Sequence, residues 1–503
     1  MGELRQKLFT KKPIDVLLAQ ASEEGANSLR RGLGAFSVTA IGIGAIIGAG
    51  IFVLTGQQAA INAGPGIVLS FILAGVVCTF AALCYAELAS MIPVSGSAYT
   101  YTYATLGEFI AWIVAWDLIL EYGLAASTVS AGWSGHFRDL LEGFGLTLPY
   151  EWSHAPFSFH NEKFDVTGAY LNLPAMVIVT LMASALIAGI AHSAVVNNVI
   201  VGLKLTIVAM VIAFGLAYVD PSLWHPLIPQ QIPATATEPS HFGYQGIVAA
   251  AGVIFFAYIG FEAVSTAAQE TRNPQRNMPI GILSALAICT VLYILMALVI
   301  TGLAPYATLN NDAPVARALA NIPDLYWLRQ VVNLGVAVGL GSTILSLLYG
   351  QSRVFYAMSR DGLLPPLFAK VNPKTRTPVW GTAITAGAAA LVGGLFPIDV
   401  LGKLVSMGTL LAFALICGGV FYLRLKHPEI PRVFKTPLWW LTAPFGVLGC
   451  LYLVSGLPPE TWLRLIVWMV IGLVVYATYA YHHSRYHEKK MAAGSKPATS
   501  AAE

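Results

Sequence analysis

The stretch Gly42–Phe52 reads GIGAIIGAGIF and places four glycines within eleven residues. It is too hydrophobic for a surface loop, yet each glycine inside a helix costs roughly 0.5–1 kcal/mol relative to alanine. The surrounding chain has 503 residues, of which 56% are hydrophobic and 11% charged. Soluble domains carry about 25% charged residues, so this composition indicates a membrane protein. The stretch is therefore interpreted as a break inside a membrane-spanning helix.

Hydropathy and helix-breaking residues predict an all-α polytopic membrane protein with twelve transmembrane helices. Their expected ranges are 36–62, 66–91, 97–127, 171–191, 194–219, 244–268, 279–303, 327–357, 378–396, 400–424, 438–456 and 460–482. Most of the 28 lysines and arginines lie in segments that are cytoplasmic if the N-terminus is inside. Both termini are then cytoplasmic, which requires an even number of spans. The expected location is the cell membrane.

Neither the histidines nor the cysteines form a recognisable metal motif. The largest predicted outside loop, about 128–170, contains His136, His154 and His160, which we interpret as surface residues. The five cysteines all fall in apolar spans without a CxxC pair, so we expect them to pack as small hydrophobic residues.

A second break is predicted in the sixth span, where Phe255–Glu270 reads FFAYIGFEAVSTAAQE. Gly260 interrupts the apolar run, and Glu262 follows two residues later. Interrupted helices at matching positions of two halves are typical of transporters built from inverted repeats. We therefore expect five-helix repeats at 36–219 and 244–424, two further helices within 438–482, and cytoplasmic segments at 1–35 and 483–503.

Two broken helices could bind a zwitterion. The N-terminus of a half-helix presents free N–H groups and a positive dipole end to a carboxylate, while unwound carbonyls can accept from an ammonium group. The alternative is that the glycines only allow helices to pack closely. The paired break in the sixth span favours a ligand site.

Lys204 is the most unusual ionisable residue because it lies well inside the fifth span. A charged lysine near a helix centre costs on the order of 2.5–3.5 kcal/mol, so such residues are usually functional, here as a candidate proton acceptor. The alternative is a lysine whose side chain extends to the cytoplasmic interface.

Buried carboxyl groups are expected at Glu121 and Glu262, either as structural groups that join helices or as protonatable charges beside a substrate. Asp117 lies one turn before Glu121 and is the weaker candidate, and Glu87 is interpreted as structural. On the cytoplasmic side, Arg272 and Arg276 could pair with Glu270 or Glu87 to form an inner gate.

Several classes of function are disfavoured by missing motifs. The chain lacks a GxxxxGK[ST] phosphate loop, a GxSxG elbow and an HExxH pair. We therefore expect neither an ATP-driven pump nor an enzyme, and no cofactor. The expected partners are a small-molecule substrate, a proton and membrane lipids, without nucleic acid, and the sequence identifies no partner protein.

Five motifs resemble those of the amino acid–polyamine–organocation superfamily, and most closely its bacterial homologues of cationic amino acid transporters. They are GIGAIIGAGIF, CYAELASMIPVSGSAYTYTYATLGE, WDLILEYG, FFAYIGFEAVSTAAQETRNPQRNMPIGI and LYGQSRVFYAMSRDGLLP. The resemblance covers about residues 30–482 and implies the LeuT fold, with two inverted five-helix repeats and two peripheral helices.

The resemblance also implies a substrate site at the two breaks. The substrate carboxylate would bind at Gly48, Ala49 and Gly50, although many relatives have threonine where this chain has Ala49. The substrate amine would meet carbonyl groups of Ile46, Phe256, Ala257 and Ile259.

Further site residues follow from the same resemblance. Lys204 matches a helix 5 lysine that replaces a sodium ion in proton-coupled members, and Ser342 aligns near that vacated site. Glu262 matches a position that is often aspartate, and Leu347 falls where the family limits the size of the substrate side chain.

The leading hypothesis is a proton-coupled L-amino acid importer that works by alternating access. A second hypothesis is a sodium-independent exchanger of amino acids or polyamines in which Lys204 is a structural cation that does not titrate. A third, from another class, is an amino acid receptor that no longer transports. Small neutral and cationic substrates both remain open.

Overall fold

The computed structural model describes residues 8–13, 17, 32–94, 97–160, 163–189, 194–233, 240–372, 375 and 377–485. Most of the two predicted cytoplasmic segments, 1–35 and 483–503, lies outside these residues, together with several of the basic residues that predicted their orientation.

The described chain is almost entirely helical. The part before residue 225 contains α3 (Ala35–Ile46), η1 (Gly50–Leu54), α4 (Thr55–Gln58), η2 (Ala59–Ala63), η3 (Gly64–Gly66), α5 (Ile67–Met91), α6 (Ser97–Thr105), α7 (Glu108–Gly143), α8 (Tyr150–Ser153), α9 (Leu173–Ile187), α10 (Ala194–Gly215), η5 (Leu216–Tyr218) and η6 (Pro221–Trp224). One antiparallel hairpin joins β1 (Phe157–His160) to β2 (Lys163–Val166).

The remainder contains α11 (Gly243–Ile254), η7 (Phe255–Tyr258), η8 (Glu262–Glu270), α12 (Pro274–Leu303), η9 (Tyr306–Leu309), α13 (Pro314–Ala320), η10 (Pro323–Leu325), α14 (Tyr326–Arg360), η11 (Pro366–Ala369), α15 (Val379–Leu395), α16 (Ile398–Lys426), α17 (Trp439–Ser455), α18 (Pro459–Val475), η12 (Tyr476–Ala480) and α19 (Tyr481–His483).

Eight helical segments of the described chain are long and apolar enough to cross a membrane: Gly50–Met91, Glu108–Gly143, Asn198–Tyr218, Gly243–Ser265, Pro274–Leu303, Pro323–Arg360, Val400–Lys426 and Pro459–His483. Four shorter apolar helices, Ala35–Ile46, Leu173–Ile187, Val379–Leu395 and Trp439–Ser455, fall within predicted spans. A straight crossing needs about 20 residues, so the polytopic all-α architecture is established while the count of twelve stays a prediction.

The prediction of a span at 97–127 followed by an outside loop was wrong. The chain turns at Gly107, which has a φ of +101°, and divides this region into α6 and α7. Helix α7 then continues through His136 to Gly143, well into the predicted loop. Hydropathy missed its second half because that half is polar, although most of its polar side chains are buried against neighbouring helices, as Asp139 is against Arg329 of α14.

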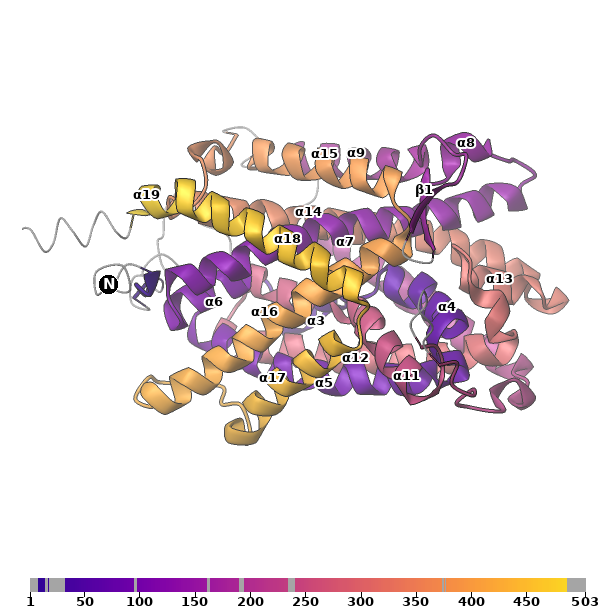
Figure 1. Ribbon diagram of the computed structural model, residues 1–503, viewed down its shortest axis with the longest axis horizontal. Helices are drawn as coiled ribbons and strands as arrows, with labels where there is room; N and C mark the ends of the chain where they lie inside the picture. Colours follow the sequence, from indigo (N-terminus) through magenta and orange to yellow (C-terminus); the bar gives the residue numbers. More distant parts are fainter. Residues whose placement is uncertain are drawn as a thin grey trace, which may run out of the picture.

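The helices lie roughly along the long axis of the molecule (Figure 1), with α6 and α19 at one end and α8, α13 and β1 at the other. Helix α7 is central and packs against α14, α16, α15 and α9. Helix α3, the first half of the first broken helix, contacts α12 and α10. The second half, η1–α4, contacts α12 and α11. Both breaks are therefore enclosed by long helices.

Glu87 forms the most densely paired carboxylate of the described residues at the end that carries α6. Its two oxygens accept from Arg424 at 2.9 and 2.7 Å, from Arg432 at 3.0 Å and from the Thr436 amide at 2.8 Å. The side chain is 1% exposed. The expected pairing of Glu87 with Arg272 or Arg276 was wrong, because arginines from the end of α16 and the following loop occupy both of its oxygens. Glu87 joins α5 to α16 and to the start of α17.

We predict that Glu87→Gln destabilises the protein strongly, because two partly buried guanidinium groups lose their counter-charge. Removing one partner of a buried ion pair typically costs roughly 3–5 kcal/mol. The measurement is thermal unfolding of the detergent-solubilised chain. Glu429→Gln is the matched control, since Glu429 is 68% exposed and pairs with His427 at the surface. Equal melting temperatures for the two variants would contradict the structural role of Glu87.

Candidate functional site

The first break separates α3 from η1. Helix α3 ends at Ile46, and Ile47 has an extended ψ of 97°. The chain resumes helical geometry at Gly50, so the N–H groups of the first turn there have no partner within the helix. A Cβ atom on Gly50 would lie 2.4 Å from both Cα and Cβ of Ala257. Glycine is required at this position because two backbones touch.

The second break separates η7 from η8 and meets the first. Ile259 is extended, with a ψ of 135°, and Gly260 has a φ of +124° that favours glycine. A Cβ on Gly260 would lie 2.6 Å from the Ala45 carbonyl carbon. The Gly260 amide donates to Glu262 Oε2 at 2.8 Å, so Glu262 caps its own half-helix. The two unwound segments thus lie against one another.

Tyr293 of α12 connects the two breaks. Its hydroxyl lies 2.9 Å from the Ile46 carbonyl oxygen and 2.7 Å from that of Ala257. A hydroxyl has one proton, so it can fully satisfy only one of these two carbonyls at a time. These are two of the four carbonyls expected to meet a substrate amine. Ser406 of α16 supports the same region by accepting from the Phe256 amide at 3.1 Å and donating to Val253.

Lys204 extends from α10 to the first break and not to the cytoplasmic interface. Its Nζ donates to the carbonyls of Gly44 and Ile47 at 2.8 and 2.9 Å, and to Thr343 Oγ1 of α14 at 2.8 Å. The residue is 1% exposed. An ammonium group has three N–H donors, and each has an acceptor here. Lys204 therefore joins α10, α14 and the end of α3.

Thr343, and not the expected Ser342, is the hydroxyl beside Lys204. Ser342 donates to the Gly339 carbonyl of its own helix at 2.8 Å. One residue along a helix rotates the side chain by about 100°, which is why the neighbouring position differs. Leu347 is 5% exposed and lies four residues after Thr343, hence on the same face of α14.

Three buried carboxyl groups lie close to the second break. Asp117 and Glu121 of α7 are 2% and 1% exposed, and Glu262 is fully buried. Glu121 interacts electrostatically with both Glu262 and Asp117. Within the described residues, neither oxygen of Asp117 or Glu121 accepts a hydrogen bond of good geometry, and the same is true of Glu262 Oε1. The group therefore has unused capacity for protons or a cation.

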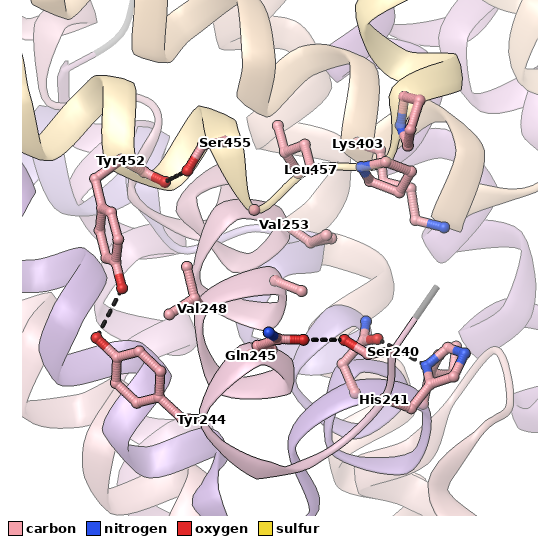
Figure 2. Close-up of a pocket in the computed structure, with 16 residues that line it drawn as sticks. Ser240, His241, Tyr244, Gln245, Val248, Val253, Lys403, Tyr452, Ser455 and Leu457 are labelled. Carbon is pink, nitrogen blue, oxygen red and sulfur yellow. Dashed lines mark hydrogen bonds between the residues drawn. The ribbon is translucent and has the colours of Figure 1, made fainter. Parts of the chain in front are cut away.

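A cavity of about 430 Å³ opens near the start of α11 and contains none of the expected site residues. Figure 2 shows the Tyr244 and Tyr452 hydroxyls facing each other at 2.7 Å on one side, and Ser240 donating to Gln245 on another. Its lining reaches Val253, three residues before Phe256. This volume is ordinary for a small-molecule pocket, and it lies apart from the two breaks.

The structure brings together most of the residues that the sequence singled out. Ile46, Gly48, Ala49 and Gly50 lie at the first break, and Phe256, Ala257, Ile259 and Glu262 at the second. Tyr293, Thr343 and Ser406 were missed. Each is an ordinary polar residue in an apolar helix, and its spacing from the breaks in sequence gives no signal of contact.

The sequence of this chain is similar to those of known transport proteins over most of its length. The sequence profile of the amino acid permease family matches residues 33–476. The branched-chain amino acid permease BcaP of Bacillus subtilis is 45% identical over 486 residues, covering 96% of this chain and all of that protein. A methylthioribose transporter of the same organism is 45% identical over 477 residues, covering 95% of this chain and 98% of its own length. The chloroplastic cationic amino acid transporter 9 of Arabidopsis thaliana is 34% identical over 477 residues, covering 93% and 80%.

We predict that Tyr293→Phe loosens both breaks, because the Ile46 and Ala257 carbonyls lose their shared donor. A buried group left unsatisfied costs roughly 1–3 kcal/mol. Hydrogen–deuterium exchange should accelerate in peptides that cover residues 44–50 and 256–261. Tyr99→Phe is the matched control, since that hydroxyl is similarly buried but donates to Asp361 and not to a carbonyl of either break. Equal acceleration in both variants would mean that Tyr293 does not specifically hold the breaks.

Proposed function

Because this chain belongs to the amino acid permease family and is a transporter rather than an enzyme, we propose that it carries L-amino acids across the cell membrane by secondary active transport. The observation that carries this proposal is the contact between the two helix breaks, Gly50 against Ala257 and Gly260 against Ala45. Helix N-termini and unwound carbonyls converge there, and an α-amino acid offers a carboxylate and an ammonium group to match them.

The proposal includes twelve transmembrane helices in a LeuT-like arrangement, with five-helix repeats at 36–219 and 244–424 and cytoplasmic termini. The end that carries α6 and α19 would then face the cytoplasm, and the end with α8 and α13 the outside. Each repeat opens with a broken helix, which is the pattern of inverted-repeat transporters.

In this proposal Gly48, Ala49 and Gly50 bind the substrate carboxylate, and the carbonyls of Ile46, Phe256, Ala257 and Ile259 bind its amine. The residues at these positions are at most 5% exposed wherever a fraction is given, so the described conformation is closed around the site. Alternating access would require α3 or η1–α4 to move away from α7 and α14. A substrate amine would replace the Tyr293 hydroxyl at one of the two carbonyls that it now shares.

Lys204 would couple transport to a proton. The charged ammonium donates to all three acceptors, whereas a neutral amine has two N–H groups and could donate to only two of Gly44, Ile47 and Thr343. Proton loss would thereby weaken the connection between α10 and the end of α3. A proton can shift the equilibrium between outward and inward states only if the states bind it differently, and this contact supplies such a difference.

The side chain of the substrate would lie toward Leu347 and the carboxyl groups of Glu121 and Glu262. These carboxyls either hold protons and accept a neutral substrate, or release them and bind a cationic side chain. Relatives are named for branched-chain and for cationic amino acids, so both kinds of substrate should be tested. Methylthioribose, for which another relative is named, should be tested beside them. We propose L-amino acids as the substrate class without narrowing it further.

The runner-up is a sodium-independent exchanger in which Lys204 keeps its proton throughout. The full set of acceptors around its ammonium would suit that role equally well. A receptor without transport is not favoured, because the similar proteins of known role are permeases and transporters.

We predict that Lys204→Gln abolishes proton-driven accumulation while preserving exchange. Purified protein in liposomes would be given labelled amino acid with and without an inward proton gradient, and alanine, serine, valine, arginine, lysine and methylthioribose would compete for uptake. The wild type should accumulate label at least several-fold more with the gradient, and the variant should show counterflow exchange only. Thr343→Val should weaken coupling in the same direction, because it removes one acceptor of the ammonium.

Ser342→Ala is the matched control, since the Ser342 hydroxyl contacts only its own helix in the described structure. Equal accumulation by wild type and Lys204→Gln would make Lys204 structural and favour the exchanger. Absence of both accumulation and counterflow in the wild type would contradict amino acid transport itself.

A further inference from the structure

His136 occupies a position that neither the predicted site nor the proposed mechanism uses. The sequence suggested a surface residue in an outside loop, but His136 is fully buried in α7, at the level where this helix meets α14 and η1. A fully buried imidazole normally has partners for both ring nitrogens. Among the described residues, only Nδ1 of His136 has a hydrogen-bond partner of good geometry.

The hydrogen bonds of α14 determine which nitrogen carries the proton. Arg329 binds Asp139 through Nε at 2.9 Å and through Nη2, and the Asn333 side-chain amide also donates to Asp139. The amide oxygen of Asn333 therefore faces His136 Nδ1, at 2.8 Å, and can only accept. Neutral His136 must carry its proton on Nδ1, so Nε2 holds a lone pair.

The imidazole of His136 packs against the second half of the first broken helix. The ring of His136 lies edge-on to Phe52, with centroids 6.3 Å apart, and the backbone of Phe52 is within reach of the imidazole. Nε2 nevertheless makes no hydrogen bond of good geometry within the described residues. A lone pair and a carbonyl oxygen are both acceptors, so a hydrogen bond between them requires one more proton.

The charges around His136 are already paired with one another. Asp139 of α7 is bound by Arg329 of α14, and Asp312, in the segment between α12 and α14, is bound by Arg138 of α7. Burial opposes a charge on the His136 ring, and both carboxylates act electrostatically in favour of one. The segment Gly50–Gln58 brings no titratable side chain to this contact. A proton added at Nε2 would therefore have the Phe52 carbonyl as its new partner.

We propose that His136 is a second proton-binding residue, in which a proton taken up at Nε2 forms a hydrogen bond to the Phe52 carbonyl and joins α7 to η1. No covalent bond changes, and the proton comes from the solution on the side of α8 and α13. Lys204 contacts the α3 side of the break, whereas His136 contacts the η1 side, so the two halves of one broken helix would each respond to a proton. The inference rests on the proposed function for its role in transport.

The test measures the separation of η9 and the end of α7 as pH changes. Spin labels would be attached to Ala307→Cys and Phe144→Cys, both exposed, in the full chain, where the native cysteines are buried. Ala307 reports on η2 at the outer end of the first helix, because η9 packs against η2. In otherwise wild-type protein, the pH is lowered from about 8 to about 5, the range of histidine titration. The population with the shorter distance between the two spin labels should then increase several-fold.

His136→Asn retains a donor for Asn333 but cannot bind a proton, so it should stay at the alkaline distribution at every pH. His136→Gln serves as a second non-titrating variant and should also lose the pH response, which keeps the test valid if one variant fails to fold. His154→Asn is the control, since His154 lies on the same side and bonds only within 150–154 among the described residues. It should respond as the wild type does.

A pH response that survives in His136→Asn or His136→Gln would overturn the proposal, as would its absence in the wild type. Counterflow exchange of labelled amino acid, measured with the same preparations, separates this result from the proposed function. A pH response that requires His136, in a protein without exchange, would support the proton site and count against amino acid transport.

Discussion

The structure depends on one constraint: backbone polar groups inside a membrane must find partners within the protein. Two interrupted helices would be intolerable if either faced lipid alone. Here each break lies against the other, with Gly50 touching Ala257 and Gly260 touching Ala45. The Tyr293 hydroxyl lies within hydrogen-bond distance of the Ile46 and Ala257 carbonyls, and Lys204 donates to those of Gly44 and Ile47. Ser406 and Glu262 accept from freed amides. Three of these side chains, Tyr293, Lys204 and Ser406, come from the long helices α12, α10 and α16.

Charged groups follow two different patterns in the same molecule. Toward the ends, carboxylates are fully paired, as Glu87 is with two arginines and Asp139 is with Arg329. In the middle of α7, Asp117 and Glu121 accept no hydrogen bond of good geometry among the described residues, and Glu121 interacts with Glu262 of the second break. An unpaired buried charge is costly, so carboxyl groups in such surroundings favour a bound proton. The paired carboxylates fix helices to one another, and the unpaired ones are the groups that the proposed function places beside the substrate.

The first broken helix receives a basic side chain on each side of its break. Lys204 donates to carbonyls at the end of α3, and the ring of His136 packs against Phe52 of η1 while its Nε2 makes no hydrogen bond of good geometry among the described residues. The two residues come from α10 and α7, two helices other than the broken one. Protonation at either position would change how one half of that helix is held. This arrangement offers a physical route by which protons could bias each half separately.

The sequence by itself determined the class of the protein and the position of both breaks. Runs of apolar residues report membrane helices because bilayer thickness sets their length, and glycine clusters report breaks because glycine is a poor helix former. Lys204 and Glu262 could be singled out because a charge in an apolar run is expensive wherever the helix packs. The prediction that Ser342 lies beside Lys204 was wrong by one position, since hydropathy does not give the rotation of a helix about its axis.

Only the tertiary structure decided which side chains meet. Nothing in the sequence joins Tyr293 to both Ile46 and Ala257, or Glu87 to Arg424 and Arg432, because these contacts connect residues far apart in the chain. His136 was misplaced for the same reason. The second half of α7 is polar enough to read as a loop, and it is buried only because α14 supplies Asn333 and Arg329 as partners. Hydropathy measures the cost of removing a residue from water, whereas the structure also supplies the hydrogen bonds that offset that cost.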